Sequence, residues 1–287
     1  MDSLATQIEK TQVLPTTTST TDETNKPTQE PVRRFDPIEL EQFHHDGYVI
    51  ARGLLSEKMR REMLQLVKSH VRDEIQPIEY EAEVQYPGAP QSLNAEGGRT
   101  ARRLKQAHSR HSIFTDWIQQ PSLVARLNQL LGPEIVMPLA HHNCVMTKQP
   151  QFSSDTGWHQ DIRYWSFQRP ELVSVWAALG SENRDNGCLQ LIPGSHRVDF
   201  HADQFDDATF FRSDLPENAD LIQSAVPAEL EAGDVLFFHS RTLHAATRNH
   251  SKQTKYSVVM TFRSIDNPPI EGTRSSSLPE MLISQIS

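Results

Sequence analysis

Cysteine is scarce in this sequence, and long hydrophobic runs are missing from it. The 287 residues include two cysteines, Cys144 and Cys188, and neither belongs to a CxxC pair. Two thiols cannot make the disulfide framework of a small secreted protein, which favours a reducing, cytoplasmic location. No apolar run approaches the roughly 20 residues that a membrane-spanning helix needs. The N-terminal sequence MDSLATQIEK carries acids and lacks the apolar core of a secretory signal.

Basic residues are outnumbered by acidic ones. There are 28 Lys and Arg against 37 Asp and Glu, which gives a formal net charge of −9. The short basic clusters near residues 60–61 and 99–105 do not form the basic stripe that a nucleic-acid-binding protein needs. We therefore expect a small-molecule partner, no nucleic acid and no membrane span, while the oligomeric state is left open.

The chain divides into a polar beginning and a long remainder. Residues 1–34 are rich in Thr, Ser, Gln, Glu and Pro, with too little apolar surface to offset the entropy of ordering the chain. This composition predicts a disordered tail over 1–34 and a single domain over 35–287. Helical periodicity and helix-start signals predict helices over 37–43, 56–75 and 122–131.

The second half of the chain has a different pattern of apolar residues. After residue 133, short apolar or alternating runs are separated by turn residues such as those at 185–187. This pattern is typical of many short antiparallel strands in a sandwich or barrel, with the helices packed outside. Residues 76–112 show no clean period, which indicates either a long excursion over a site or a mobile lid.

A histidine and a carboxylate stand two residues apart in GWHQDIRYW, residues 157–165. On a strand, His159 and Asp161 would share a face. His244 follows a predicted strand that includes 235–237. Two imidazoles and one carboxylate make the facial triad of non-haem Fe(II), which leaves open positions for a keto acid and O2. Other histidines compete for the third position, namely His141, His142, His239 and His250.

Four motifs in order resemble the phytanoyl-CoA dioxygenase family, a branch of the Fe(II)/2-oxoglutarate-dependent oxygenases. They are HQD at 159–161, Trp176 in VSVWAAL, NGCLQLIPGSH at 186–196, and GDVLFFHSRTLHAATRN at 233–249. The resemblance covers roughly residues 36–265. It implies a mostly β fold, a double-stranded β-helix (jelly-roll, cupin-like) core with N-terminal helices packed outside.

The resemblance also implies roles for individual residues. His159, Asp161 and His244 would hold Fe(II), and 2-oxoglutarate and O2 would bind beside them. Trp176 would lie near the co-substrate, although plain core filling is an equal alternative. Family members usually have an Arg eleven residues after the second His, where this chain has Lys255.

Lys255 is expected to pair with the distal carboxylate of 2-oxoglutarate, although an exposed lysine at the start of a strand is an alternative. Ser257 falls on the same strand face and could donate its hydroxyl to that carboxylate. Lysine is a point charge, whereas arginine offers a planar fork, so the geometric selection should be weaker. Lys105 is a further candidate near the co-substrate, with Arg102 and Arg103 as alternatives. Cys144 falls where family members often have a Met beside the co-substrate, so the resemblance implies that it borders 2-oxoglutarate.

The function implied is a dioxygenase that hydroxylates an apolar or amphiphilic small molecule and releases succinate and CO2. With Asp161 present, hydroxylation is favoured over halogenation, for which relatives carry a small residue there. Three aromatic residues follow the HxD pair, namely Tyr164, Trp165 and Phe167. They either border the substrate or pack in the core. Two alternatives remain: a metal-binding cupin-like barrel of other chemistry, and a non-catalytic relative.

Overall fold

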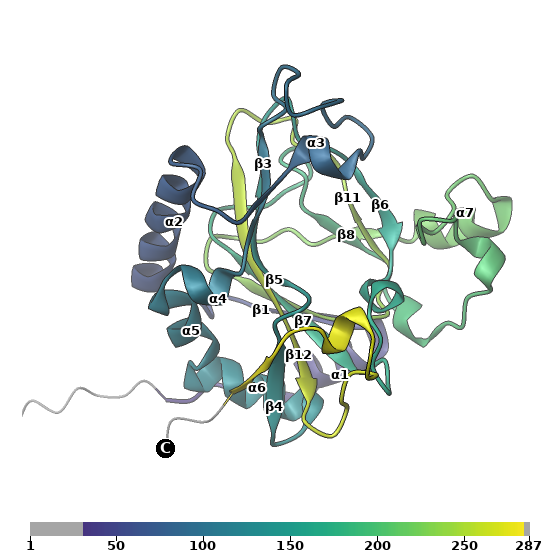
Figure 1. Ribbon diagram of the computed structural model, residues 1–287. Helices are drawn as coiled ribbons and strands as arrows, with labels where there is room; N and C mark the ends of the chain where they lie inside the picture. The colour runs from purple at the N-terminus through teal and green to yellow at the C-terminus, as the bar shows by residue number, and fades with distance from the viewer. Residues whose placement is uncertain (1–30, 284–287) are drawn as a thin grey trace, which may run out of the picture. The chain divides into compact units, whose positions relative to one another are not determined.

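The fold is two antiparallel β-sheets with helices against the outer face of the larger one (Figure 1). This computed structural model describes residues 31–283. The arrangement confirms the mostly β architecture with flanking helices that the sequence predicts. The predicted disordered tail over 1–34 lies almost wholly outside the described residues, so the division into a tail and one domain stays a prediction.

The larger sheet has the strand order β1-β10-β7-β12-β5-β3-β2, with β4 also pairing β12, and β13 pairing β4. Its strands are β1 (Tyr48–Ala51), β2 (Ile78–Tyr80), β3 (Ala101–Lys105), β4 (Ile135–Pro138), β5 (Asn143–Lys148), β7 (Leu172–Ala178), β10 (Val235–His239), β12 (Lys255–Ser264) and β13 (Glu280–Ile283). The smaller sheet has the order β6-β11-β8-β9. Its strands are β6 (Thr156–His159), β8 (Leu189–Leu191), β9 (Val226–Pro227) and β11 (His244–Ala246).

The three predicted helices are present as α1, α2 and α6. The α-helices are α1 (Pro37–Asp46), α2 (Glu57–Arg72), α3 (Glu81–Val84), α4 (Ala107–Arg110), α5 (Ser112–Ile118), α6 (Pro121–Leu131) and α7 (Pro216–Gln223). The short 3-10 helices are η1 (Asp161–Tyr164), η2 (Ser195–Arg197), η3 (Ala202–Gln204) and η4 (Arg274–Ser276). The helix α1 begins with a capping box, in which Asp36 accepts from the Glu39 amide and Glu39 accepts from the Asp36 amide. Within residues 31–283, no helix is both long and apolar enough to cross a bilayer.

The larger sheet has two buried faces of different character. Along β12, Val258, Met260 and Phe262 pack with the helices α5 and α6 in the main apolar core. Val259 points the other way and packs with Trp176 between the two sheets. Because side chains alternate along a strand, residues 255, 257, 259 and 261 share this inner face, which is the face that carries the candidate site.

Part of the region predicted to be irregular belongs to the larger sheet. Within residues 76–112, β3 pairs with β5, so that Leu104 lies opposite Val145 and Lys105 lies opposite Cys144. The alternatives of a long excursion over a site and a mobile lid therefore missed the regular elements β2, β3 and α4. Leu104 is buried against the helices, whereas Arg103 and Lys105 are on the inner face. Charged residues on a buried face hide the alternation by which a strand is recognised.

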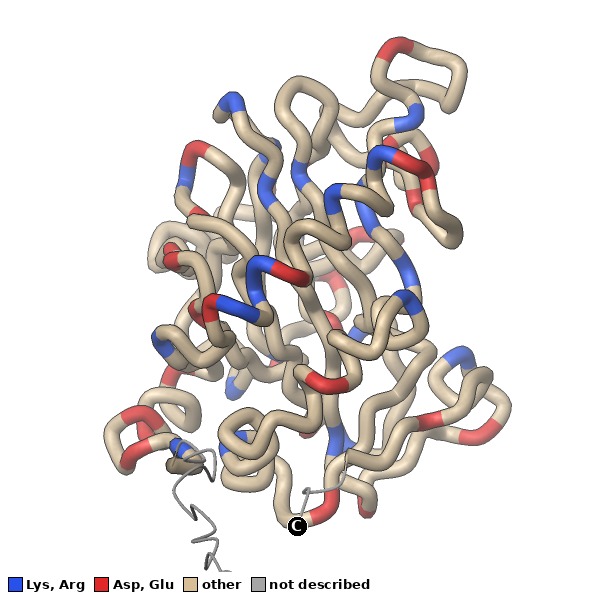
Figure 2. Tube along the Cα trace, turned by 90° about the vertical axis from the view of Figure 1, so that its left-hand side faces the viewer, with Lys and Arg blue, Asp and Glu red and all other residues tan. Residues whose placement is uncertain are grey.

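Charged residues of both signs are interspersed along the trace (Figure 2). Several form exposed pairs, such as Glu57 with Arg61 on α2. An exposed ion pair of this kind contributes only about 0–1 kcal/mol. The stability of the fold therefore depends chiefly on the apolar core between the helices and the larger sheet.

Phe237 on β10 tests this core. Its side chain is fully buried, and its ring meets that of Phe35 edge to face with 5.0 Å between the centroids. Replacing it by alanine leaves a cavity, so Phe237→Ala should lower the free energy of unfolding by about 3–5 kcal/mol. Ile38→Ala, at a side chain that is 77% exposed, is the control and should change it by less than about 0.5 kcal/mol. Chemical denaturation followed by circular dichroism measures both; similar values for the two variants would contradict the assignment of the core.

Candidate metal centre

The pairing of β6 with β11 brings two of the candidate ligands together. His244 lies opposite His159 in the register, and their ring centroids are 4.1 Å apart. Asp161 is two residues past the end of β6, in the first turn of η1, rather than on the strand itself. One ligand atom from each of these three residues lies within 4.8 Å of the other two. The competing His239 packs against His196 instead.

Backbone hydrogen bonds orient both imidazoles. Nδ1 of His159 is 2.8 Å from the carbonyl oxygen of Gly157, and Nδ1 of His244 is 3.0 Å from that of Thr242. A carbonyl oxygen only accepts, so each Nδ1 carries the proton and each Nε2 presents its lone pair. The two Nε2 atoms lie 3.9 Å and 3.8 Å from Oδ1 of Asp161. Second-shell bonds of this type fix the tautomer of a metal-binding histidine.

The Asp161 carboxylate is held from two sides. Nε2 of His142 lies 3.0 Å from its Oδ1, and the Ser174 hydroxyl on β7 donates to its Oδ2 at 3.1 Å. The Ser174 hydroxyl is also 3.1 Å from that of Thr261 on β12. The larger sheet therefore orients the carboxylate, while the smaller sheet supplies the two imidazoles.

Burial sets the protonation states of the three groups. It lowers the pKa of His159 to about 3, with His244 adding to the effect, and it also lowers the pKa of His244. Burial alone would raise the pKa of Asp161, but the neighbouring imidazoles of His142 and His244 outweigh it and hold that pKa below its usual range. Near pH 7 the set is two neutral imidazoles and one carboxylate, which fits a divalent transition metal such as Fe(II).

A cavity of about 410 Å³ opens beside His159 and Asp161. Its wall carries the predicted residues Cys144 and Lys105, and also Arg103. The remaining wall residues are Pro77, Glu79, Tyr86, Gln106, Leu139, Ala140, His141, His142, Asn143, Thr156, Tyr164, Trp165, Arg274 and Leu278. The wall is thus mixed, with aromatic and aliphatic groups beside several charges.

Other candidates from the sequence lie elsewhere. Arg102 is not on the wall of this cavity and donates to Glu81, Ser154 and Thr156. Phe167 packs with Trp165 and Leu172 in a separate apolar cluster.

The predicted co-substrate residues Lys255, Ser257 and Trp176 come together, but around a carboxylate of the protein. All three donate to Glu182, a residue in the turn that follows β7. None of the three is on the wall of the cavity beside His159. Sequence reasoning missed Glu182, because one acid in the turn GSENRDNG gives no sign that it points inward.

A segment between β8 and β9 covers the edge of His159. The Phe210 ring meets that of His159 with 5.9 Å between centroids and that of Tyr86 with 5.5 Å. The Tyr164 hydroxyl donates to the Ala208 carbonyl at 3.0 Å, which fastens the same segment. Phe210 was not singled out from the sequence, and His142 was named only as a competing metal ligand. Both residues contact segments that are distant in the sequence. The pairs Phe210-Phe211 and His141-His142 are the local features that could have drawn attention to them.

Comparisons with known proteins agree with this geometry. Residues 43–257 match the sequence model of the phytanoyl-CoA dioxygenase (PhyH) family. The ectoine dioxygenase of Bordetella bronchiseptica is 23% identical over 254 residues, which cover 82% of this chain and 78% of that protein. The L-proline trans-4-hydroxylase of Streptomyces griseoviridis is 24% identical over 216 residues, covering 68% and 78%. The crystal structure of EctD from S. alaskensis with 2-oxoglutarate and 5-hydroxyectoine has a TM-score of 0.69 at 17% identity, covering 82% and 78%. The fold is thus the jelly-roll core that the sequence predicted.

Removing one imidazole should remove the metal site. Loss of an outer hydrogen bond to a ligand typically costs about 10–100-fold in metal affinity, so His244→Ala should cost more than about 100-fold. Ser174→Ala removes only a hydrogen bond to the Asp161 carboxylate, so its loss of metal affinity should lie within that 10–100-fold range. Anaerobic titration with Fe(II) or Co(II), followed by dialysis and metal analysis, measures both. His239→Ala is the control, because this histidine packs against His196. Equal affinities in His244→Ala and His239→Ala would exclude His244 as a ligand.

Proposed function

The chain belongs to the phytanoyl-CoA dioxygenase family, and we propose that it hydroxylates a small amphiphilic molecule that carries an acidic group. It is a non-haem Fe(II)/2-oxoglutarate-dependent dioxygenase, whose reaction releases succinate and CO2. The observation that carries the proposed substrate class is the cavity beside His159 and Asp161, because its wall combines apolar surface with an excess of cations.

We propose His159, Asp161 and His244 as the three iron ligands. Ferrous iron with 2-oxoglutarate supplies the activation of O2, which no side chain can perform. The chain contributes two neutral Nε2 donors with fixed tautomers and one carboxylate whose orientation is set by Ser174. Phe210 and Tyr164 shield the His159 side of the site from water.

For the co-substrate we propose the residues that the family resemblance implies. Lys255 and Ser257 would bind the distal carboxylate, and Trp176 and Cys144 would border the chelating part. Lys105 or Arg103 would add positive charge from β3. The proposed residues other than Trp176 lie on the shared inner face of β12, β5 and β3, which supports a common binding site. Trp176 packs against Cys144 and Val259 on the same side.

The charges on the cavity wall favour an acidic substrate. Arg103, Lys105 and Arg274 face it, whereas Glu79 is the one acid there apart from Asp161 among the described residues. Burial, together with the nearby Arg274, lowers the pKa of His141 to about 3, so this imidazole adds no charge near pH 7. Glu79 lies 3.4 Å from Arg103 and 3.5 Å from Lys105, whereas Arg274 has no ion pair within residues 31–283. A cation such as Arg274 beside apolar side chains suits a carboxylate on a partly apolar molecule.

The size of the cavity favours a small substrate. Its 410 Å³ lies near the lower end of the roughly 300–1,000 Å³ of ligand pockets. That space must also admit part of the co-substrate. Two relatives carry the names of enzymes acting on ectoine and on L-proline, which are small molecules as well. Of the two substrate types that the sequence predicts, apolar and amphiphilic, we therefore propose the amphiphilic one.

The location of the protein is part of the same proposal. Cys144 and Cys188 are both unpaired and buried. Free thiols are typical of a reducing compartment, so we propose the cytoplasm.

Turnover of the co-substrate tests the enzyme class directly. Purified protein with Fe(II), ascorbate and 2-oxoglutarate should release succinate, measured by chromatography or mass spectrometry, even without a second substrate. Asp161→Ala should abolish this release because one ligand is missing. Release that proceeds equally well in Asp161→Ala, or with Zn(II) in place of Fe(II), would contradict the proposed centre.

The acidic group of the substrate is tested by matched pairs of compounds. Small carboxylic and amino acids should stimulate succinate release, and their methyl esters should not. For an acid that stimulates, Arg274→Gln should raise the half-saturating concentration by about tenfold or more, since a charge-assisted bond is lost. Arg169→Gln is the control, because Arg169 pairs with Asp266 and is not on the cavity wall. Esters that stimulate as well as the free acids would overturn the substrate class.

A further inference from the structure

Glu182 occupies a built carboxylate site inside the barrel. Its side chain is fully buried, and its Oε2 accepts from Nζ of Lys255 at 2.9 Å. Its Oε1 accepts from the Ser257 hydroxyl at 2.6 Å. The indole Nε1 of Trp176 donates to both oxygens, at 3.0 Å and 3.2 Å. The carboxylate therefore has an ammonium, a hydroxyl and an indole N–H around it, and each oxygen has at least two partners.

This carboxylate site stands on the same face of the same strand as the support of the metal centre. Lys255, Ser257 and Thr261 of β12 share the inner face, and Thr261 contacts the Ser174 hydroxyl that holds Asp161. Between them, Val259 packs against Trp176 and Cys144. A ligand that reached from the metal centre along β12 would meet Lys255 and Ser257 with its far end.

We propose that Glu182 is an internal ligand of the Lys255–Ser257 site and that the distal carboxylate of 2-oxoglutarate binds there only by displacing it. This inference rests on the co-substrate roles given under the proposed function. The side-chain carboxylate of Glu182 is the same chemical group as the distal end of 2-oxoglutarate, so the same donors suit both. One buried ammonium cannot neutralise two buried carboxylates, and two like charges in one site repel each other.

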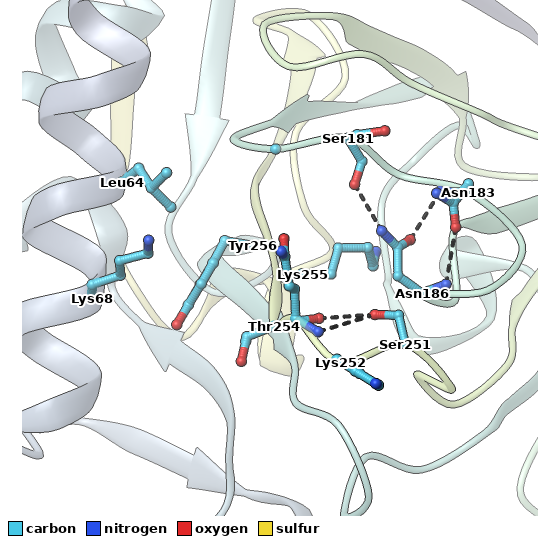
Figure 3. A pocket seen from close by; sticks show the side chains of 12 residues that line it. Leu64, Lys68, Ser181, Asn183, Asn186, Ser251, Lys252, Thr254, Lys255 and Tyr256 are labelled. Carbon is cyan, nitrogen blue, oxygen red and sulfur yellow. Dashed lines mark hydrogen bonds between the residues drawn. The ribbon is translucent and has the colours of Figure 1, made fainter.

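The turn that carries Glu182 borders a groove in which solvent can replace lost contacts. Figure 3 shows this groove, where Ser181, Asn183 and Asn186 of the turn face Leu64 and Lys68 of α2. The groove measures about 450 Å³, and Lys68 and Lys252 lie on its wall. The neighbours of Glu182 on both sides, Ser181 and Asn183, are therefore at the surface. The backbone of Glu182 pairs with that of Leu230, and Lys255 is itself on the groove wall. A change of the Glu182 side-chain rotamer, rather than a shift of the whole turn, would therefore move its carboxylate away from Ser257 and Trp176 toward the hydrated, cationic groove.

Competition of this kind predicts a selective change in affinity. Removing the Glu182 carboxylate should strengthen binding of a 2-oxo acid that has a distal carboxylate. It should not change binding of 2-oxobutyrate, which has the same chelating end and no distal carboxylate. Glu182 would thus act as a positioning residue that sets the concentration of 2-oxoglutarate at which the site fills.

Anaerobic titration of the Fe(II) protein measures this selectivity without turnover. Calorimetry or the visible absorption of the ferrous 2-oxo acid chelate gives Kd for 2-oxoglutarate and for 2-oxobutyrate. In Glu182→Gln and Glu182→Ala, the Kd for 2-oxoglutarate should fall at least tenfold, with little change for 2-oxobutyrate. An unchanged or larger Kd for 2-oxoglutarate, or an equal change for both acids, would overturn the proposal.

A second measurement, of the melting temperature, needs no iron and can be made on a destabilised variant. In metal-free Glu182→Ala, the buried Lys255 has no counter-charge, so the melting temperature should drop by about 5–15 °C. Glutarate at saturating concentration should restore about 5 °C or more to this variant and add little to the parent protein. Glu81→Gln is the matched control, because Glu81 is also fully buried and contacts a buried cation, Arg102, and a serine hydroxyl. Rescue of both variants to the same extent, or of neither, would overturn the proposal.

The two proposals fail in different ways. If the parent protein releases no succinate under any condition, the proposed reaction is wrong, whatever glutarate does to Glu182→Ala. If succinate is released but the Glu182 variants do not distinguish 2-oxoglutarate from 2-oxobutyrate, the reaction stands and the internal ligand is excluded.

Discussion

The antiparallel register of β6 and β11 is the constraint on which the candidate centre depends. Opposite residues of two paired strands have side chains about 5 Å apart, so the pairing of His244 with His159 fixes the separation of the two imidazoles. A slip of one residue would turn one ring to the other face of the sheet. The position of Asp161 does not depend on strand pairing, because Asp161 lies two residues after His159 and its carboxylate is held by His142 and Ser174.

The same geometry explains why the two faces of the larger sheet differ. The face against the helices is apolar and supplies most of the burial that stabilises the fold. On the inner side two buried ion pairs form, Asp161 with His142 and Glu182 with Lys255. Buried ion pairs add little net stability, since desolvation offsets the attraction between the charges. Their presence on the face that carries the metal centre is therefore better explained by binding than by folding.

The sequence predicted those features that depend on local pattern. The helices α1, α2 and α6, the β-rich second half and the convergence of His159, Asp161 and His244 all followed from periodicity, caps and motif order. The strand β3 was missed because Arg103 and Lys105 occupy its inner face, so that its alternation looks polar. Glu182 and Phe210 were missed for another reason. Each acts on a residue far away in the chain, and nothing in its own neighbourhood indicates which way its side chain points.

Glu182 would also account for Lys255, which stands where the family resemblance leads us to expect an arginine. An arginine fork binds a carboxylate through two parallel bonds and so engages both oxygens at once. Here Oε1 of Glu182 is already engaged by Ser257 and both oxygens by the indole of Trp176, which leaves one end-on position at Oε2. A lysine ammonium fills a single position of this kind, as Lys255 does at 2.9 Å. If Lys255 binds the co-substrate as we propose, its departure from arginine is matched by an internal carboxylate, Glu182, with which it forms a buried pair.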